Sequence, residues 1–196
     1  VFEGVYQTAL VYLNAWLLTR NVNGYAEFTV EAGPYLKYGA DNLLKVIADN
    51  SLEPNSRWYT GSGIYRPVRL LVGNKVYLPQ DTVRITTREA DEGFALLDVT
   101  AQVQSASTVT ERVTLQQTIC REGTAVLTDR QNLLLQPGES RTVSFRYCVD
   151  SPALWSPENP NLYTSTMQVL EGEEELDREE TGFGIRTLSI DAAQGV

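Results

Sequence analysis

Apolar and polar residues alternate through most of the chain after residue 80, and this period of two is typical of a half-buried β-strand. The longest run places five apolar residues on one face, namely Ala95, Leu97, Val99, Ala101 and Val103. Its opposite face carries Asp98, Thr100, Gln102 and Gln104. Shorter runs cover residues 83–88, 113–119, 142–149 and 163–169, and β-rich runs lie at 11–13 and 43–47. No stretch carries an apolar stripe of helical period beyond two turns, so the pattern predicts an all-β protein.

Turn-forming residues separate the predicted strands. Arg121-Glu122-Gly123, Gln136–Glu139 and Glu171-Gly172-Glu173 each lie between two runs, as hairpin connections do. Residues 80–190 therefore hold roughly seven strands, the number in an immunoglobulin-like β-sandwich. Before residues 74–80 the chain is irregular, aromatic and rich in glycine, with fewer strands than a closed two-sheet domain needs. We expect this first part to be the later portion of a larger sandwich.

Composition narrows the chemistry. The chain has 196 residues, of which 42% are hydrophobic and 21% charged, as in ordinary globular proteins. It contains no histidine, which excludes a Ser-His-Asp system and a His-ligated zinc site. A formal net charge of −9 does not indicate nucleic acid or an anionic membrane as a partner. Runs of about 18 apolar residues are absent, so we expect no membrane span. The residues indicate no metal and no cofactor.

Cys120 and Cys148 are the only thiols, and two interpretations of them are open. They are free and buried, which is the interpretation we favour, or they form a disulfide between strands, which requires an oxidising compartment.

Seven carboxylates crowd the segment from Glu171 to Glu180. Paired carboxylates can cleave glycosides, and clustered carboxylates can bind calcium. This run lies on a predicted hairpin turn and lacks the Asp-x-Asp spacing of a calcium loop. We therefore expect a solvated turn and an edge strand whose charges oppose aggregation.

The most unusual segment runs from Asp49 to Arg66 and combines a cation, aromatic residues and two glycines between two strands. Sugar rings stack on aromatic faces and accept hydrogen bonds from amide and guanidinium groups, so this loop suits a polyol. It also suits a packed corner, in which glycines allow a tight backbone and Arg57 stacks on a ring, and this is the interpretation that we favour from the residue chemistry alone. A second segment, Ser151 to Tyr163, predicts a long crossing between strands that is held by a buried Trp155.

Four separated motifs resemble glycoside hydrolase family 2, the relatives of β-galactosidase, β-glucuronidase and β-mannosidase. In chain order they are Phe2–Tyr6 with Val11–Asn14 and Gly24-Tyr25, then Arg57-Trp58-Tyr59 with Gly61–Arg66, then Leu154–Pro157 with Leu162-Tyr163, and Gly182–Arg186. Ala15 departs from the pattern, because the family usually has glycine there, and the Trp16–Asn23 loop also differs.

The resemblance implies three parts. Residues 1–74 would be the C-terminal part of a sugar-binding jelly-roll domain, residues 75–190 an immunoglobulin-like β-sandwich, and residues 191–196 the start of a linker to a catalytic β/α barrel. The two catalytic glutamates of the family lie on that barrel, so no catalytic residue is assigned here. The chain would then be a non-catalytic part of a retaining, β-galactosidase-like enzyme, with its own barrel and a β-glycoside as partners.

In the family, the loop that matches Asn55–Gly61 lies near the mouth of the active site. The resemblance therefore makes Asn55, Arg57, Trp58 and Tyr59 candidate sugar-binding residues. It makes Trp155, Phe183 and Arg186 packing and interdomain residues. A stand-alone carbohydrate-binding module and a structural immunoglobulin-like spacer stay open as alternatives. The unpaired edge of a half jelly roll also leaves a homo-oligomer open.

Overall fold

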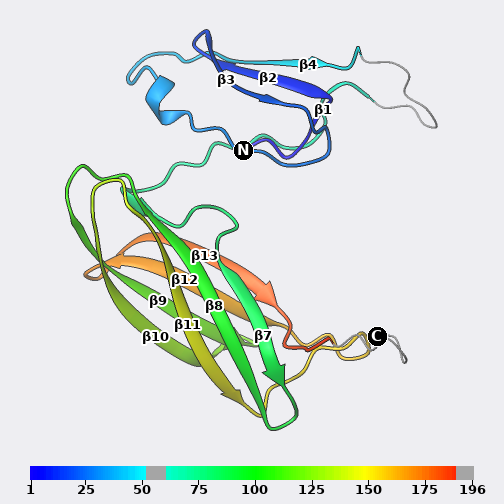
Figure 1. The fold of residues 1–196 in the computed structure, drawn as a ribbon, viewed down its shortest axis with the longest axis vertical. Coiled ribbons are helices and arrows are strands. Elements are labelled where there is room, and N and C mark those ends of the chain that lie inside the picture. Colours follow the sequence, from blue (N-terminus) through cyan, green and yellow to red (C-terminus); the bar gives the residue numbers. More distant parts are fainter. Residues whose placement is uncertain (52–60, 189–196) are drawn as a thin grey trace. The chain divides into compact units, whose positions relative to one another are not determined.

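The computed structural model describes residues 1–51 and 61–188, and these residues are almost entirely β (Figure 1). Their only helical element is the single 3₁₀ turn η1 (Gly33–Tyr35). The chain divides into two compact units, Val1–Val72 and Gly73–Val196. None of the described residues forms a helix long and apolar enough to span a membrane. The expected all-β class is confirmed.

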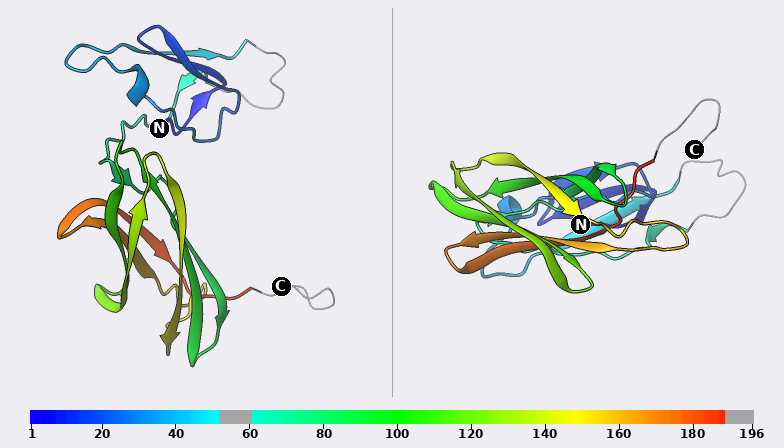
Figure 2. Two further views of the ribbon diagram at one scale, coloured as in Figure 1. Left: turned by 60° about the vertical axis from the view of Figure 1, so that its left-hand side comes forward. Right: turned by 90° about the horizontal axis from the view of Figure 1, so that it is seen from below.

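The second unit is a sandwich of two antiparallel sheets. Its strands are β6 (Val76–Tyr77), β7 (Arg84–Ala90), β8 (Phe94–Ser105), β9 (Glu111–Arg121), β10 (Thr124–Leu135), β11 (Ser140–Asp150), β12 (Tyr163–Glu171) and β13 (Glu174–Phe183). One sheet has the order β10–β9–β12–β13. In the other, β8 pairs with β11 along one edge and with both β6 and β7 along the other. The sheets lie face to face (Figure 2), as in an immunoglobulin-like sandwich.

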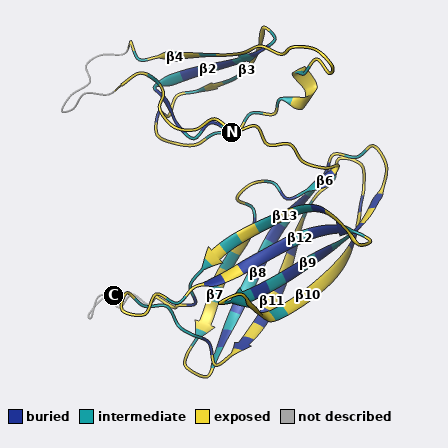
Figure 3. Ribbon diagram, turned by 180° about the vertical axis from the view of Figure 1, so that it is seen from behind, coloured by how far each residue is buried: buried dark blue, intermediate teal, exposed yellow. Residues whose placement is uncertain are grey.

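The core of this sandwich comes from the predicted alternation. All five apolar residues that alternate from Ala95 to Val103 on β8 are fully buried. Leu115 and Ile119 of β9 and Met167 of β12 belong to the same cluster and are also fully buried. Since successive side chains of a strand point to opposite faces, a period of two places one whole set in the core (Figure 3).

Two of the three predicted hairpin turns are confirmed, whereas Gln136–Glu139 is a turn that connects β10 of one sheet to β11 of the other, so the hairpin predicted there is wrong. Glu122 and Gly123 join β9 to β10 with φ of +50° and +78°, the left-handed conformation that a tight two-residue turn requires. Gly138 and Gly172 have φ of +72° and +63° in the turns before β11 and β13. Strand β13 lies at the edge of its sheet, as the acidic run predicts.

Two expectations about burial are wrong. Cys120 and Cys148 are free, but Cys120 is partly exposed and Cys148 is exposed, because Cys148 lies between the inward-facing positions of β11. Trp155 is only partly buried, because it lies in the crossing after β11 and not on a core-facing strand position. The guanidinium of Arg186 lies over its ring, 4.7 Å from the ring centre.

The first unit has two small sheets. Its strands are β1 (Val5–Tyr6), β2 (Thr8–Leu13), β3 (Trp16–Asn21), β4 (Leu44–Asp49) and β5 (Gly63–Ile64). One sheet has the order β3–β2–β4, and β1 pairs with β5 in the other. Isolated bridges join Phe2 to Phe28 and to Val68, and the ring of Phe2 stacks on that of Phe28 with ring centres 5.0 Å apart. The buried core of this unit comprises Phe2, Val5, Ala9 and Val11.

Candidate functional site

The four predicted sugar-binding residues, Asn55, Arg57, Trp58 and Tyr59, lie outside the residues that the structure describes. Both flanks of the segment that carries them are described. Strand β4 leads toward it and ends at Asp49, and β5 follows it from Gly63. The geometry of the candidate site is defined by these two flanks.

Polar side chains join the flanks to each other. The amide nitrogen of Asn50 donates a hydrogen bond of 3.0 Å to the Oγ of Ser62. Next to it, the backbone N–H of Ser51 donates to Asp49 Oδ1 over 2.9 Å. Hydrogen bonds from Ser51 hold the pKa of the Asp49 carboxyl below its ordinary value. The Asn50 and Ser62 side chains thus close the base of the segment.

A cluster of tyrosines lies beside this base. In the β1–β5 pair, Tyr6 is directly opposite Gly63. The ring of Tyr25 meets the ring of Tyr6 edge to face, with ring centres 5.4 Å apart and planes 62° apart. Tyr65, two residues after Gly63, donates from its hydroxyl to the carbonyl oxygen of Gly24 over 2.8 Å. Three segments therefore converge where the candidate loop returns to the fold.

Gly24 makes this convergence possible. A Cβ at this position would overlap the ring of Tyr6, so no other residue fits without displacing that ring. Tyr6, Tyr25 and Tyr65 all fall within family motifs of the sequence, but none of the three is a predicted site residue. No local signal marks these tyrosines as neighbours, because the alternation pattern does not reveal which segments meet.

The flanks of the candidate segment present aromatic surface to solvent. Tyr25 is 57% exposed and Tyr65 48% exposed, so aromatic surface is accessible beside the loop. The Asn50 Oδ1 atom is buried and has no hydrogen-bond partner in the described part of the chain. Within residues 1–51 and 61–188, no three His, Cys, Asp or Glu side chains gather closely enough to hold a metal ion.

The residues predicted to pack do so within the second unit. Trp155 donates from its backbone N–H to the carbonyl of Ile185 over 2.8 Å, and Arg186 lies over its ring. Phe183 packs on Tyr163 with ring centres 5.7 Å apart. Their role between domains stays a prediction.

Comparison with known proteins identifies the class. The model of the family described as glycosyl hydrolases family 2 matches residues 76–186, which is more than half of the chain. The chain belongs to this family, and the resemblance read from its motifs is confirmed.

Individual relatives match both units. The chain is 35% identical over 195 residues to β-galactosidase BoGH2A of Bacteroides ovatus. This alignment covers 99% of the chain and 23% of that protein. It is 25% identical over 215 aligned positions to a β-glucuronidase of Formosa agariphila, covering 99% of the chain and 22% of that protein. A crystal structure of a family 2 member from Bacteroides cellulosilyticus superimposes with a TM-score of 0.92 at 31% identity, over 99% of the chain and 27% of that structure. The chain thus spans less than a quarter of the length of these two curated relatives.

Proposed function

We propose that this chain is the non-catalytic β part of a retaining, β-galactosidase-like family 2 glycoside hydrolase. In this assignment residues 1–74 are the C-terminal part of a sugar-binding jelly roll, residues 75–190 an immunoglobulin-like domain, and residues 191–196 the start of a linker to a catalytic barrel. The observation that carries the proposal is that 99% of the chain matches a β-galactosidase while covering only 23% of it.

The chemistry then belongs to the remainder of such an enzyme. Retaining glycosidases use two carboxylates about 5 Å apart, one as acid/base and one as nucleophile. We assign neither role to a residue of this chain. Its part is to support the barrel and to complete one wall of the sugar pocket.

That wall is assigned to the segment between Asn50 and Ser62. Asn55, Arg57, Trp58 and Tyr59 are the residues that we expect to contact the terminal sugar. The hydrogen bond from Asn50 to Ser62 and the tyrosines beside Gly63 support this assignment, because they hold both ends of the segment. An anchored loop loses less conformational freedom when it binds a ligand.

The first test uses the chain alone. We expect no turnover of a nitrophenyl β-galactoside beyond that of a mock preparation, and no heat in titration calorimetry with a galactoside panel. Turnover above the mock level would contradict the non-catalytic assignment. Galactoside binding that Trp58→Ala abolishes would favour the alternative, a stand-alone carbohydrate-binding module.

The second test measures the effect of the proposed wall residues in an active enzyme. Residues 1–196 replace the matching segment of the Bacteroides ovatus β-galactosidase, and the chimaera is assayed with a nitrophenyl β-galactoside. Trp58→Ala or Arg57→Ala should raise KM about tenfold, the effect of about 1.4 kcal/mol of lost binding. Trp16→Ala is the matched control, since Trp16 lies on β3 and is 65% exposed. Equal KM values for all three variants would contradict the proposed wall.

A further inference from the structure

Strand β13 contains a β-bulge near its start. The register shifts between Val169 and Leu170 of β12, so that Leu176 has no residue opposite it. A bulge leaves the extra residue outside the ladder and redirects the side chains around it. Leu176 is buried, and Asp177 is opposite the fully buried Val169, so both residues lie on the inner face of the sheet. The bulge thereby offers a carbonyl oxygen and a carboxylate next to each other at the edge of the sandwich.

The segment that opens the second unit binds to both groups. The side-chain amide of Asn74 donates to the carbonyl oxygen of Leu176 over 2.7 Å. The backbone N–H of Leu78 donates to Asp177 Oδ2, also over 2.7 Å. These bonds join residues that are 102 and 99 positions apart in the sequence. Neither Asn74 nor Leu78 belongs to a strand, so both bonds are additional to the pairing of the sheets.

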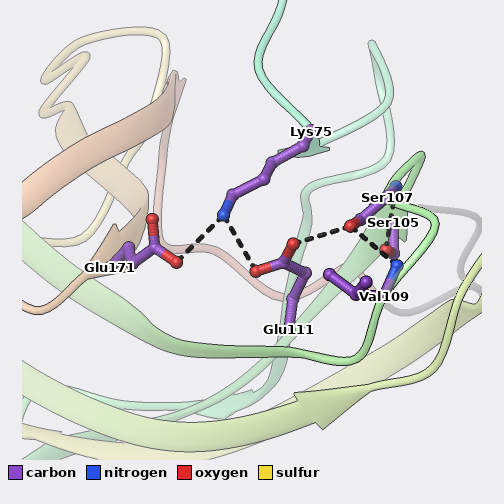
Figure 4. A network of polar contacts seen from close by, with 6 residues as sticks. All are labelled: Lys75, Ser105, Ser107, Val109, Glu111 and Glu171. Carbon is purple, nitrogen blue, oxygen red and sulfur yellow. Dashed lines mark hydrogen bonds and ion pairs between the residues drawn. The ribbon is translucent and has the colours of Figure 1, made fainter.

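The same segment is fixed to the other sheet by its backbone. Strand β6 pairs with the end of β8, and the N–H of Ala106 donates to the carbonyl of Lys75 over 2.7 Å. Val76 is fully buried and Leu78 is 7% exposed. The ammonium group of Lys75 pairs with two carboxylates of the opposite sheet (Figure 4). Residues 74–78 therefore lie across the edge of the sandwich and contact both sheets, and we call them the strap.

The strap begins where the two compact units divide. The first unit ends at Val72 and the second begins at Gly73, so Asn74 is held to β13 one residue after the division. Strand β6 alone pairs through only Val76 and Tyr77. The ends of so short a strand open easily, and the bonds of Asn74 and Leu78 restrain the chain on either side of it.

We propose that the strap fixes the point from which the chain leaves the sandwich toward the first unit, and that Asn74 and Asp177 are the positioning residues that hold it there. The inference rests on the proposed function, because the first unit carries the proposed wall of the sugar pocket. A wall that is in place for only part of the time binds the sugar in only that fraction of molecules. The strap thus lowers KM and takes no part in the chemistry.

The first measurement is amide hydrogen exchange in the whole chain. Asp177→Ala removes the acceptor of the Leu78 N–H, which should then exchange about tenfold faster. Asp177→Asn is the matched control, because it loses the same charge and keeps a side-chain oxygen, so Leu78 should exchange nearly as in wild type. Asn74→Ala, at an exposed residue, should also speed exchange at Leu78. Unchanged exchange in β8 shows that the sandwich stays folded in all three variants.

The second measurement is KM in the chimaera with the β-galactosidase. Asp177→Ala should raise KM about threefold and leave kcat unchanged, and Asp177→Asn should have a KM close to that of the unmodified chimaera. This split and this rescue separate positioning from a general loss of stability, which would lower the amount of active enzyme and leave KM unchanged.

The two measurements can fail independently. Equal exchange of the Leu78 N–H in wild type and Asp177→Ala would overturn the strap. Equal KM for the chimaera with and without Asp177→Ala would overturn the positioning role, provided that Trp58→Ala does raise KM. If Trp58→Ala also leaves KM unchanged, the proposed wall has failed and the positioning role falls with it, and the exchange of Leu78 alone decides whether the strap exists.

Discussion

The ammonium group of Lys75 lies 3.0 Å from one carboxylate oxygen of Glu111, a side chain that is only 6% exposed (Figure 4). The hydroxyl of Ser107 donates to the other oxygen of Glu111 over 2.6 Å. Lys75 also pairs with Glu171 at 3.1 Å. Lys75 precedes β6, Glu111 begins β9 and Glu171 ends β12, so one cation connects elements of both sheets.

Lys75→Met should lower the stability of the sandwich. It removes the cation and leaves the enclosed carboxylate of Glu111 without a charge partner, which costs free energy. We expect a lower urea midpoint for Lys75→Met and a nearly unchanged one for Lys75→Arg. Adding Glu111→Gln to Lys75→Met should recover much of the loss. A double variant as unstable as Lys75→Met alone would contradict this account.

The same contacts make stability depend on pH. The hydrogen bond from Ser107, and after it the one from Lys75, holds the pKa of Glu111 below its ordinary value of 4.5. A carboxyl with a lower pKa in the folded state stabilises the fold above the unfolded pKa, and this contribution is lost as pH falls through the folded pKa. The urea midpoint of Glu111→Gln should therefore lie well below wild type at about pH 7 and approach it at about pH 3. An equal difference between the urea midpoints of Glu111→Gln and wild type at both pH values would contradict this explanation.

Glu179 shows the opposite shift. Burial raises the pKa of its carboxyl above 4.5, and the charges of Asp81 and Asp177 raise it further, while the backbone N–H of Val83 lowers it. Glu179 is directly opposite the buried Met167 in the β12–β13 pair, so it lies on the inner face of an edge strand. Such an inward charge hinders pairing with another chain at the cost of stability.

Glu179→Gln should therefore stabilise the protein at neutral pH. A raised folded-state pKa gives stability that is present below the unfolded pKa and is lost as pH rises through the folded pKa. The variant keeps a hydrogen-bond acceptor, so its urea midpoint should exceed wild type at about pH 7 and match it at about pH 4. Glu180→Gln is the matched control, because the hydrogen bond and charge of Arg178 lower the pKa of Glu180. Stabilisation by both variants would point to net charge as the cause.

Gly184→Ala should disturb the packing of Trp155. A Cβ on Gly184 would lie 2.8 Å from three atoms of that side chain, whereas a Cβ on Gly182 would meet nothing within 4 Å. Overpacking of this kind costs about 1–3 kcal/mol. We expect Gly184→Ala to lower the urea midpoint and shift the tryptophan fluorescence, and Gly182→Ala to change the fluorescence little. Similar spectra for the two variants would show that Trp155 relaxes without cost.

The alternation of residues predicts strands whose two faces meet different surroundings. It predicts β8, where every second residue enters the core, and it did not single out β10. The inward positions of β10 include Asp129 and Gln131, which are directly opposite Gln117 and Leu115 of β9. Polar residues on the inner face of an edge strand discourage aggregation, but they remove the period of two.

The candidate site was less accessible to sequence reasoning than the fold. Periodicity reports which face of a strand is buried, but not which distant segments meet, so the approach of Tyr6 to Gly24 and the bond from Asn50 to Ser62 had no local signal. The sugar-binding assignment came instead from a motif, Arg57-Trp58-Tyr59, whose resemblance to a family does not require knowledge of the contacts.

Gln117 is a fully buried amide in the core of the sandwich. Its nitrogen donates to Ser165 Oγ over 2.9 Å and to the carbonyl of Thr118 over 3.1 Å. Its oxygen is buried without a hydrogen-bond partner in the described part of the chain. A buried polar atom without a partner costs free energy, so the bond to Ser165 is the main compensation for placing an amide here.

Ser165→Ala should therefore destabilise the protein by about 1 kcal/mol, because it removes the acceptor and keeps the buried amide. Gln117→Leu removes the amide and leaves a side chain of similar size. Replacing both partners of a buried hydrogen bond by apolar groups is close to neutral, so the double variant should match or exceed wild type in its urea midpoint. The slope of free energy against urea should stay constant if both states keep their compactness. A double variant less stable than Ser165→Ala alone would mean that Gln117 is better satisfied than its contacts indicate.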